Sequence, residues 1–293
     1  MAQARVGVIG GSGFYNMPGL SDVQEVRIDT PFGSPSDAIV VGSLDGPFGP
    51  SAPLRAGSAQ GRQRVAFLPR HGVGHRLLPA EVPSRANIYA LKQLGVELVI
   101  GVSAVGSLRE EIRPLDLVVP DQAIDRTRGR PSTFFGEGLV AHVAFANPFC
   151  PRLSEVLAGS AQEAGAAVHP RGTYVVIEGP AFSTRAESHL YRGWGADVIG
   201  MTALPEAKLA REAEMCYAIL ACATDYDCWH EVHGDVTAEM IVANLLKNVA
   251  VSQQAVRLAL GRLPETRECA CASALQDALV TSWGLVPQAT RRR

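Results

Sequence analysis

Residue types that bind anions follow four apolar, strand-like runs of the sequence, directly after the end of each run. They are Ser12, Arg70 with His71, Ser103 and Thr202, and the runs are 6–9, 64–68, 98–102 and 198–200. Hydroxyl groups, a guanidinium and the backbone N–H groups of a glycine turn can all hold a phosphate oxygen. Because open α/β sheets bind ligands at the carboxyl ends of their strands, this recurrence predicts one shared anion site.

Two carboxylates follow a fifth apolar run, at 217–223. Asp225 and Asp227 are two residues apart, so both can contact one edge of a ligand. An ordinary acidic turn is the alternative interpretation of an isolated Asp-x-Asp sequence. The apolar run that leads directly into the pair favours a functional position.

The glycine turn at 6–13 (VGVIGGSG) does not complete a dinucleotide-binding fingerprint. The third glycine would lie three residues after Gly13, where the sequence has Asn16, and Pro18 disfavours a helix directly afterwards. A nicotinamide-dependent dehydrogenase is therefore only an alternative enzyme class, and a tight structural turn is the alternative for the glycines themselves. A phosphate-binding turn is favoured because Ser12 adds a hydroxyl.

The cysteines and histidines do not predict a metal site. Cys228, His230 and His233 match none of the usual zinc-ligand spacings. Cys269 and Cys271 are too close for a relaxed disulfide, and the sequence shows no second ligand pair beside them. We therefore expect no metal, and a free or redox-sensitive thiol pair near the C-terminus.

The elements that must position these residues alternate between strands and helices. Further strands are expected at 38–44, 117–119 and 173–177, and helices at 85–94, 151–164, 185–194, 205–215 and 237–260. Ser84 is the expected N-cap of the first helix, and Thr184 with Glu187 forms a capping box for the third. The alternation predicts one α/β domain over residues 1–293 with a largely parallel central sheet.

Two stretches stand apart from this alternation. Residues 46–61, rich in Gly, Pro, Ser and Ala, are expected to form a loop insertion between two strands. Residues 261–293 are expected to be a C-terminal extension with a helix and a basic tail.

Composition narrows the class of protein. Lys and Arg total 27 against 29 for Asp and Glu, so the formal charge of −2 gives no general attraction to nucleic acids. The 47% hydrophobic content suits a large buried core, and the apolar runs are far shorter than the ~18 residues of a membrane-spanning helix. Six sparse cysteines are typical of a reduced, cytoplasmic protein.

Eight sequence blocks occur in an order that resembles one family. They are VGVIGGSGFY, LPRHGVGH, VSAVGSL, IDRTRGRPSTFF, NPFCP, VIEGPAFSTRAES, GMTALPEAKLARE and ATDYDCW. Over residues 5–260 the chain is similar to the 5′-methylthioadenosine phosphorylases, which are among the trimeric purine nucleoside phosphorylases. The resemblance implies a single α/β domain with a mixed central sheet that forms a partly closed barrel surrounded by helices.

The resemblance also implies an activity. This is phosphorolysis of S-methyl-5′-thioadenosine to adenine and 5-methylthioribose 1-phosphate, a step of methionine and purine salvage, with inorganic phosphate as co-substrate and no metal or organic cofactor. A homotrimer or a hexamer is implied, and neither nucleic acid nor a membrane is an expected partner. The alternatives are a purine nucleoside phosphorylase for adenosine or for 6-oxopurine nucleosides such as inosine or methylthioinosine, and a non-catalytic nucleoside-binding protein.

The matching blocks imply roles for individual residues. Phosphate is expected to contact Ser12, Arg70, His71, Ser103 and Thr202, and Ala104 through its backbone. Asp225 and Asp227 are the expected catalytic residues at the purine, and burial beside Asp227 is expected to raise the pKa of Asp225 so that it protonates N7. The nucleoside is expected to contact Met201, Phe182, Ser183, Val236 and Ile241 and, from a neighbouring subunit, His142 and Leu285. Ala181 departs from the family's pattern, in which Arg or Gln often follows Glu-Gly-Pro.

Overall fold

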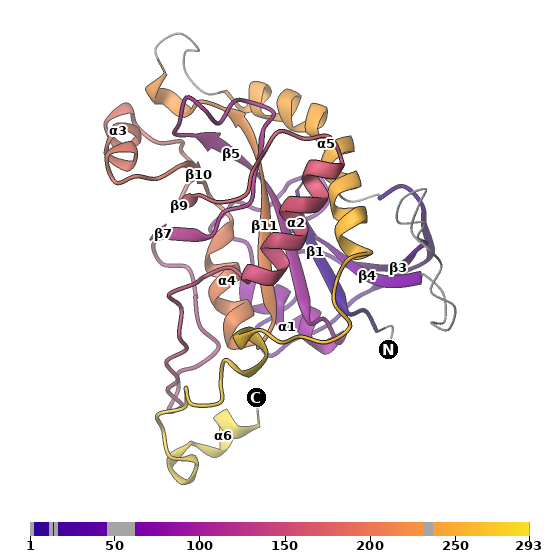
Figure 1. The fold of residues 1–293 in the computed structure, drawn as a ribbon. Coiled ribbons are helices and arrows are strands. Elements are labelled where there is room, and N and C mark those ends of the chain that lie inside the picture. Colours follow the sequence, from indigo (N-terminus) through magenta and orange to yellow (C-terminus); the bar gives the residue numbers. More distant parts are fainter. Residues whose placement is uncertain (1–2, 12–13, 15–16, 46–61, 231–236, 293) are drawn as a thin grey trace.

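The computed structural model describes residues 3–11, 14, 17–45, 62–230 and 237–292. The described strands are β1 (Val6–Gly10), β2 (Leu20–Val26), β3 (Ile39–Asp45), β4 (Arg62–Pro69), β5 (Leu98–Ser107), β6 (Leu117–Val118), β7 (Gln122–Arg126), β8 (Val168–His169), β9 (Thr173–Ile177), β10 (Val198–Gly200) and β11 (Cys216–Asp225) (Figure 1). The described helices are α1 (Ser84–Gln93), α2 (Pro151–Glu163), α3 (Arg185–Gly193), α4 (Ala203–Glu212), α5 (Ala238–Leu260) and α6 (Gln288–Arg291), with 3₁₀ turns η1 (Asp227–Trp229), η2 (Ala270–Ser273) and η3 (Trp283–Leu285).

The described strands form one mixed sheet. From one edge their order is β2, β3, β4, β1, β5, β10, β9 and β7, while β11 pairs with β5 and carries β6 and then β8. The expected mixed sheet is confirmed, and hydrogen bonds between the described strands do not close it into a ring. The centre of the sheet is largely parallel, as expected from the alternation, since the β4–β1, β1–β5 and β5–β11 pairings are parallel. Antiparallel pairings occur at β2–β3, β3–β4, β10–β5 and β6–β11. The first two join strands that follow one another in the chain, and such a connection needs no crossover helix.

Both faces of the central strands are buried, which explains their continuous apolar sequences. Along β11 the odd-numbered residues from Tyr217 to Ala223 pack in one core with α1 and α4, and the even-numbered residues from Cys216 to Cys222 pack in a second core with α2 and α5. Figure 1 shows α2 and α5 together across the sheet. A smaller core packs α3 against Tyr226 and Trp229.

Along one of its edges, β5 pairs first with β1 and then with β10, and the change of partner leaves a gap where the candidate residues lie. β11 lines one edge of β5 from Leu98 to Gly106. On the other edge, β1 ends opposite Gly101, and β10 arrives antiparallel opposite Gly106. Residues 102–105 of β5 therefore lie between the carboxyl ends of β1 and β10, which point toward each other.

Local sequence signals predict most element boundaries. Thr184 and Glu187 form the expected capping box at α3, and Thr237 caps α5 by accepting a hydrogen bond from the Met240 N–H. The expected cap at Ser84 is wrong, because α1 already includes Ser84 and Pro83 occupies the N-cap without a side-chain bond. The edge strand β2 was not expected, since its polar sequence LSDVQEV is largely exposed and carries no apolar run.

The two stretches outside the alternation have different outcomes. β3 and β4 pair antiparallel out to residues 45 and 62, as a hairpin requires, but the expected insertion at 46–61 lies outside the described residues. Residues 261–292 contain η2, η3 and the short helix α6, which lies in the basic tail. None of the helices in the described part of the chain is both long and apolar enough to cross a membrane.

Candidate active site

Ser103 places a buried hydroxyl in the gap on β5 between β1 and β10. Its Oγ makes no hydrogen bond of good geometry with any described residue. A buried polar group without a partner costs about 1–3 kcal/mol, so a ligand oxygen would complement this hydroxyl. Ala104, for which a backbone contact with phosphate is expected, follows Ser103 in the same stretch of β5.

The fully buried Tyr174 on β9 connects this hydroxyl with the end of β10. The Tyr174 Oη lies 3.5 Å from the Thr202 Oγ1, and Tyr174 is close enough to Ser103 for that side chain to affect its pKa, which burial raises. Thr202 is the N-cap of α4, yet its side chain makes no capping hydrogen bond. The hydroxyls of Ser103 and Thr202 thus converge around Tyr174 and are not used by their own elements.

Arg70, directly after β4, is fixed by a buried ion pair. Its Nε and Nη2 donate to the two carboxylate oxygens of Glu206 on α4 at 2.5 and 3.1 Å, and the Tyr217 hydroxyl donates to the same carboxylate at 2.7 Å. The other bonds of the guanidinium go to the carbonyls of Val102 (2.8 Å) and Ile9 (3.2 Å). Contacts with the described residues therefore use four of its five N–H groups.

The charge of Arg70 is matched inside the protein. Burial by itself would lower the pKa of Arg70, but the Glu206 carboxylate outweighs burial and raises it. The guanidinium is 2% exposed and joins β1, β4, β5 and α4 at the strand ends. It can offer a bound anion its remaining Nη1–H, while the shape of the site depends on the ion pair.

His71 is neutral near pH 7. Its Nδ1 lies 2.8 Å from the Leu77 carbonyl, so Nδ1 carries the proton and donates to this oxygen. Burial, with the charge of Arg70 as the second cause, lowers the pKa of His71 to about 4. The ring stacks on His75, with 4.3 Å between the ring centroids.

The carboxyl of Asp225 is held rigidly at the end of β11. The Thr224 hydroxyl donates to its Oδ2 at 2.7 Å, and the Asp227 backbone N–H donates to its Oδ1 at 2.8 Å. The β5–β11 register shifts between Ala223 and Asp225, and such a bulge turns a side chain in a new direction. Burial raises the pKa of Asp225 to about 6, with a further contribution from the charge of Asp227.

Asp227 is the second buried carboxyl, and it fixes the loop after β9. Ser183 Oγ donates to both of its oxygens, at 3.0 and 2.9 Å, and burial raises the pKa of Asp227 as well. Gly106 lies between these groups. A Cβ at Gly106 would come within 2.9 Å of Asp225 Oδ1 and 3.0 Å of Ile199 on β10, so only glycine lets the ends of β10 and β11 meet across β5.

Arg130 holds the loop after β9 against the loop after β10. Its guanidinium donates to the carbonyl oxygens of Glu178 and of Met201, the latter at 2.7 Å, and its Nε pairs with the Glu178 carboxylate at 3.0 Å. Gly179 has φ +66°, and a Cβ there would collide with Met201 Sδ. Met201 is therefore packed against the loop that carries Phe182 (43% exposed).

The model of the family described as the phosphorylase superfamily matches residues 5–260. The chain belongs to the phosphorylase superfamily. Among relatives in this superfamily, an S-methyl-5′-thioadenosine phosphorylase from Koribacter versatilis is 56% identical, over 99% of this chain and 94% of the relative.

Two solved structures of the same superfamily share the fold. A methylthioadenosine phosphorylase from an antarctic soil metagenomic library has a TM-score of 0.89 and 48% identity, over 99% of this chain and 97% of the other. A mutant of adenosine/methylthioadenosine phosphorylase from Schistosoma mansoni, in complex with methylthioadenosine, has a TM-score of 0.80 and 34% identity, over 94% of this chain and 96% of the other.

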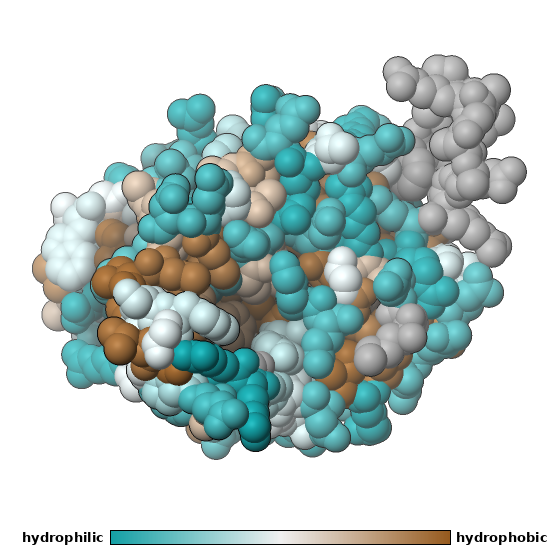
Figure 2. Space-filling view, turned by 90° about the horizontal axis from the view of Figure 1, so that it is seen from below, coloured by the Kyte–Doolittle hydropathy of each residue, from teal (hydrophilic) through white to brown (hydrophobic). Residues whose placement is uncertain are grey.

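Two residues, His142 and Leu285, are expected to contact a neighbouring subunit. Both lie on the surface of the chain, away from the buried groups described above. The His142 N–H donates to the Ala278 carbonyl at 2.8 Å, so the segment at 140–142 runs beside the C-terminal segment. Leu285 is 78% exposed and Trp283 is 60% exposed. Figure 2 views the end where the C-terminal segment lies in Figure 1 and shows hydrophobic side chains around a hollow.

Three of the residues expected to contact the substrate are not among the buried groups described above. Ser12 and Val236 lie outside the described residues. Ile241 lies half-buried in the first turn of α5, 14 positions after Asp227. These three positions, like every other expected contact with phosphate or nucleoside, remain predictions.

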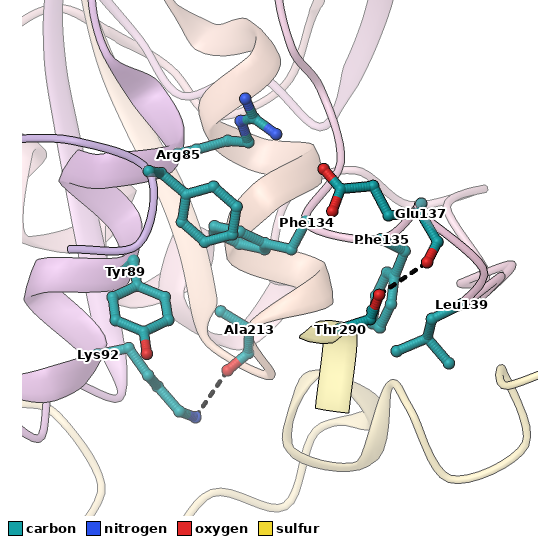
Figure 3. Close-up of a pocket in the computed structure, with 11 residues that line it drawn as sticks. Arg85, Tyr89, Lys92, Phe134, Phe135, Glu137, Leu139, Ala213 and Thr290 are labelled. Carbon is teal, nitrogen blue, oxygen red and sulfur yellow. Dashed lines mark hydrogen bonds between the residues drawn. The ribbon is translucent and has the colours of Figure 1, made fainter. Parts of the chain in front are cut away.

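A separate cavity of about 290 Å³ lies between α1, the segment at 134–139 and the C-terminal segment (Figure 3). Phe32, Tyr89 and Phe134 form its aromatic wall, and the Thr290 hydroxyl donates to the Glu137 carbonyl at its rim. None of the residues expected at the phosphate or purine that the structure describes lines it. We assign this cavity no part in the chemistry.

Sequence reasoning missed Glu206, Tyr174 and Arg130. The sequence contains a signal for the burial of Glu206, because Glu206 lies on the same helix face as the buried Ala203, Ala207 and Ala210. A carboxylate on an apolar helix face needs a buried cation as partner. Tyr174 and Arg130 act through contacts between distant segments, and their sequence positions gave no such signal.

Proposed function

We propose that the chain catalyses phosphorolysis of S-methyl-5′-thioadenosine to adenine and 5-methylthioribose 1-phosphate. The observation that carries this proposal is the buried Asp225 carboxyl, whose pKa of about 6 leaves about one tenth of it protonated at pH 7. It lies three residues along the β5–β11 ladder from the Ser103 hydroxyl, which has no hydrogen-bond partner among the described residues. One group suits a departing base and the other an incoming anion. The names of the relatives support the same reaction.

In the proposed reaction, an oxygen of phosphate forms a bond to C1′ of the ribose while the bond between C1′ and N9 of adenine breaks. The bonding electrons leave with adenine, and the proton of Asp225 passes to N7, so that a neutral base departs. Positive charge develops on the sugar ring in the transition state, and the phosphate anion beside it stabilises that charge.

A protonated Asp225 also complements adenine. Its O–H donates to N7 and its other oxygen accepts from the 6-amino group, while the Thr224 hydroxyl and the Asp227 N–H hold the carboxyl plane. A 6-oxopurine presents acceptors at both positions, which leaves one acid oxygen facing another acceptor. Such a mismatch in a buried site can cost several kcal/mol.

Phosphate is proposed to bind between the ends of β1, β4, β5 and β10. Its ligands are Ser12, His71, Ser103, Thr202, the backbone of Ala104 and the remaining Nη1–H of Arg70. The buried pair of Arg70 with Glu206 contributes chiefly by fixing these strand ends, since its net charge is close to zero. No metal or organic cofactor takes part, because phosphate itself is the nucleophile.

The 5′-methylthio group is proposed to lie against Val236 and Ile241 of the same chain and against His142 and Leu285 of a neighbouring chain in a homotrimer, which two trimers could extend to a hexamer. The exposure of Leu285 and Trp283 in the C-terminal segment, and of Val242 and Leu246 on α5, supports this arrangement, because contacts with neighbouring chains would remove these apolar side chains from water. Salvage of adenine and methylthioribose phosphate in the cytoplasm is the corresponding cellular role.

Base release tests the proposal. The protein is incubated with methylthioadenosine, adenosine, inosine or methylthioinosine, each with and without phosphate, and free base and sugar phosphate are measured. We expect adenine release from methylthioadenosine that requires phosphate and yields the 1-phosphate. Release without phosphate would identify a hydrolase, no release with any nucleoside would indicate a binding protein, and equal rates with inosine would remove the proposed role of Asp225 in choosing the base.

A further inference from the structure

Four cysteines far apart in the sequence converge at the base of β11. They are Cys150 at the N-cap of α2, Cys216 at the first position of β11, Cys269, and Cys271 in η2. Their Sγ atoms all lie within 4.8 Å of one another, and three of the four residues are buried. The second ligand pair that the sequence did not reveal beside Cys269 and Cys271 therefore comes from two distant segments. We call these residues the four-thiol cluster.

The spacing of the sulfurs suits one tetrahedral ion. A zinc–sulfur bond of about 2.3 Å places tetrahedral ligands about 3.8 Å apart. The Sγ atoms of Cys216 and Cys269 are 3.3 Å apart, and all pairs fall within 4.8 Å. A disulfide needs about 2.05 Å and joins only two sulfurs, whereas all four cysteines here are free thiols. The geometry points to a structural zinc site in which the four-thiol cluster provides every ligand.

The type of ligand selects the metal. Four soft sulfurs without a carboxylate or imidazole among them suit zinc and disfavour magnesium, calcium and manganese. The short distances between the sulfurs leave room for one ion and not for an iron–sulfur cluster, whose bridging sulfides hold the cysteines farther apart. With all four positions filled by protein, no coordination position is left for a reacting water, so the site would be structural.

The surroundings can balance the charge of such a site. Four thiolates around one Zn²⁺ carry a net charge of −2, and Cys150 lies at the positive N-terminal end of α2. Arg211 and Arg152 line a cavity of about 370 Å³ that also borders Cys269 and Cys271. Arg211 is held in place, because it donates to the carbonyls of Ala144 and Asn147 at 2.8 and 2.7 Å. The same cavity gives a metal ion a route to the thiols.

The ion would anchor the C-terminal segment to the sheet. At present Arg267 donates to the Glu214 carbonyl at 2.6 Å, and the Leu275 N–H donates to the Glu214 carboxylate at 3.1 Å. A zinc ion would add bonds from Cys269 and Cys271, at the start of η2, to the starts of α2 and β11. This inference concerns stability and is independent of the proposed reaction.

Metal binding by the reduced full-length protein tests the inference. The protein is expressed with zinc in the medium, purified without chelator under a thiol-free reductant, and analysed for metals. The metal is then removed and Co²⁺ is titrated in, because tetrahedral cobalt thiolates absorb strongly at characteristic wavelengths. We expect one zinc per chain and a cobalt–thiolate spectrum that saturates at one equivalent. Zinc should also raise the thermal midpoint and protect residues 264–292 from proteolysis.

Variants identify the ligands. Cys269→Ser with Cys271→Ser should weaken Co²⁺ binding more than about 100-fold, since even loss of a partner in the second coordination sphere costs 10–100-fold. Cys222→Ser is the control, because Cys222 is buried, as Cys271 is, but contacts the Ser252 hydroxyl outside the cluster. It should bind cobalt as the unaltered protein does.

Several results would overturn the inference. They are reduced unaltered protein that takes up neither zinc nor cobalt, unchanged cobalt affinity in the double variant, iron in place of zinc, and two intramolecular disulfides in protein made with zinc present. If the double variant fails to fold, the cobalt spectrum of the unaltered protein decides by itself.

Discussion

The pH dependence of Asp225 offers a direct test of its role as proton donor. With a pKa of about 6, about half of the Asp225 carboxyls are protonated at pH 6, about one tenth at pH 7 and about one hundredth at pH 8. An Asp225→Asn variant keeps the shape and the pairing with adenine, since an amide also bonds N6 and N7, but it cannot release a proton to N7. At pH 6 we therefore expect kcat to fall about 10²–10⁴-fold with little change in KM.

The assay measures kcat/KM for methylthioadenosine at saturating phosphate from pH 5 to 8.5, in the unaltered protein and in Asp225→Asn. The ionisation of phosphate affects both proteins equally. The kcat/KM of the unaltered protein divided by that of Asp225→Asn therefore depends on the ionisation of Asp225 alone. This ratio should be constant below pH 6 and fall about tenfold per pH unit well above it. A flat ratio, or a variant with raised KM and unchanged kcat, would refute the reasoning.

Two neighbouring variants sharpen the test because they shift the pKa in opposite directions. The charge of Asp227 raises the pKa of Asp225, so Asp227→Asn should move the break in the profile to lower pH. The Thr224 hydroxyl bonds the carboxylate and lowers the pKa, so Thr224→Val should move the break to higher pH. A break that stays in place in both variants would assign the profile to another group.

Three further predictions concern the surrounding structure. Ser103→Ala should raise KM for phosphate about tenfold without lowering the thermal midpoint, because the hydroxyl has no partner in the described chain; a lower midpoint with unchanged KM would make Ser103 structural. Glu206→Gln leaves the Arg70 charge buried without a counter-charge, and urea unfolding should show a loss of about 3–5 kcal/mol, so an unchanged midpoint would contradict the ion pair's role. Leu285→Asp should shift sedimentation from trimer to inactive monomer, and a fully active monomer would remove Leu285 from the site.

The sequence predicts the strand ends well because a buried strand must be apolar while its end can be polar. The runs before Ser103 and Asp225 are strands in the structure, and Thr184 caps its helix with a bond only three residues away. Such signals are local, so they can be recognised before any tertiary contact is known. The same signals predict that the candidate residues lie at the ends of neighbouring strands.

Contacts between distant segments escape the same reasoning. Arg70 and Glu206 are 136 positions apart, and the sequence around Arg70 does not indicate which carboxylate pairs with it. The direction of β10 is equally hidden, because its short apolar sequence would serve a parallel neighbour of β5 as well as the antiparallel one observed. The sequence did not predict the four-thiol cluster for the same reason. Cys269 and Cys271 come close to Cys150 and Cys216 only in the folded chain.

The neutral ring of His71 has a consequence for which oxyanions the proposed site accepts. With Nδ1–H engaged by the Leu77 carbonyl, the remaining lone pair of the ring is on Nε2. Hydrogen phosphate carries an O–H that such a lone pair can accept, whereas sulfate at the same pH carries none and would face the lone pair with an oxygen anion. A buried acceptor that meets another acceptor loses about 1–3 kcal/mol. The imidazole would thus let the site discriminate between two tetrahedral dianions of similar size by the presence of a single hydrogen.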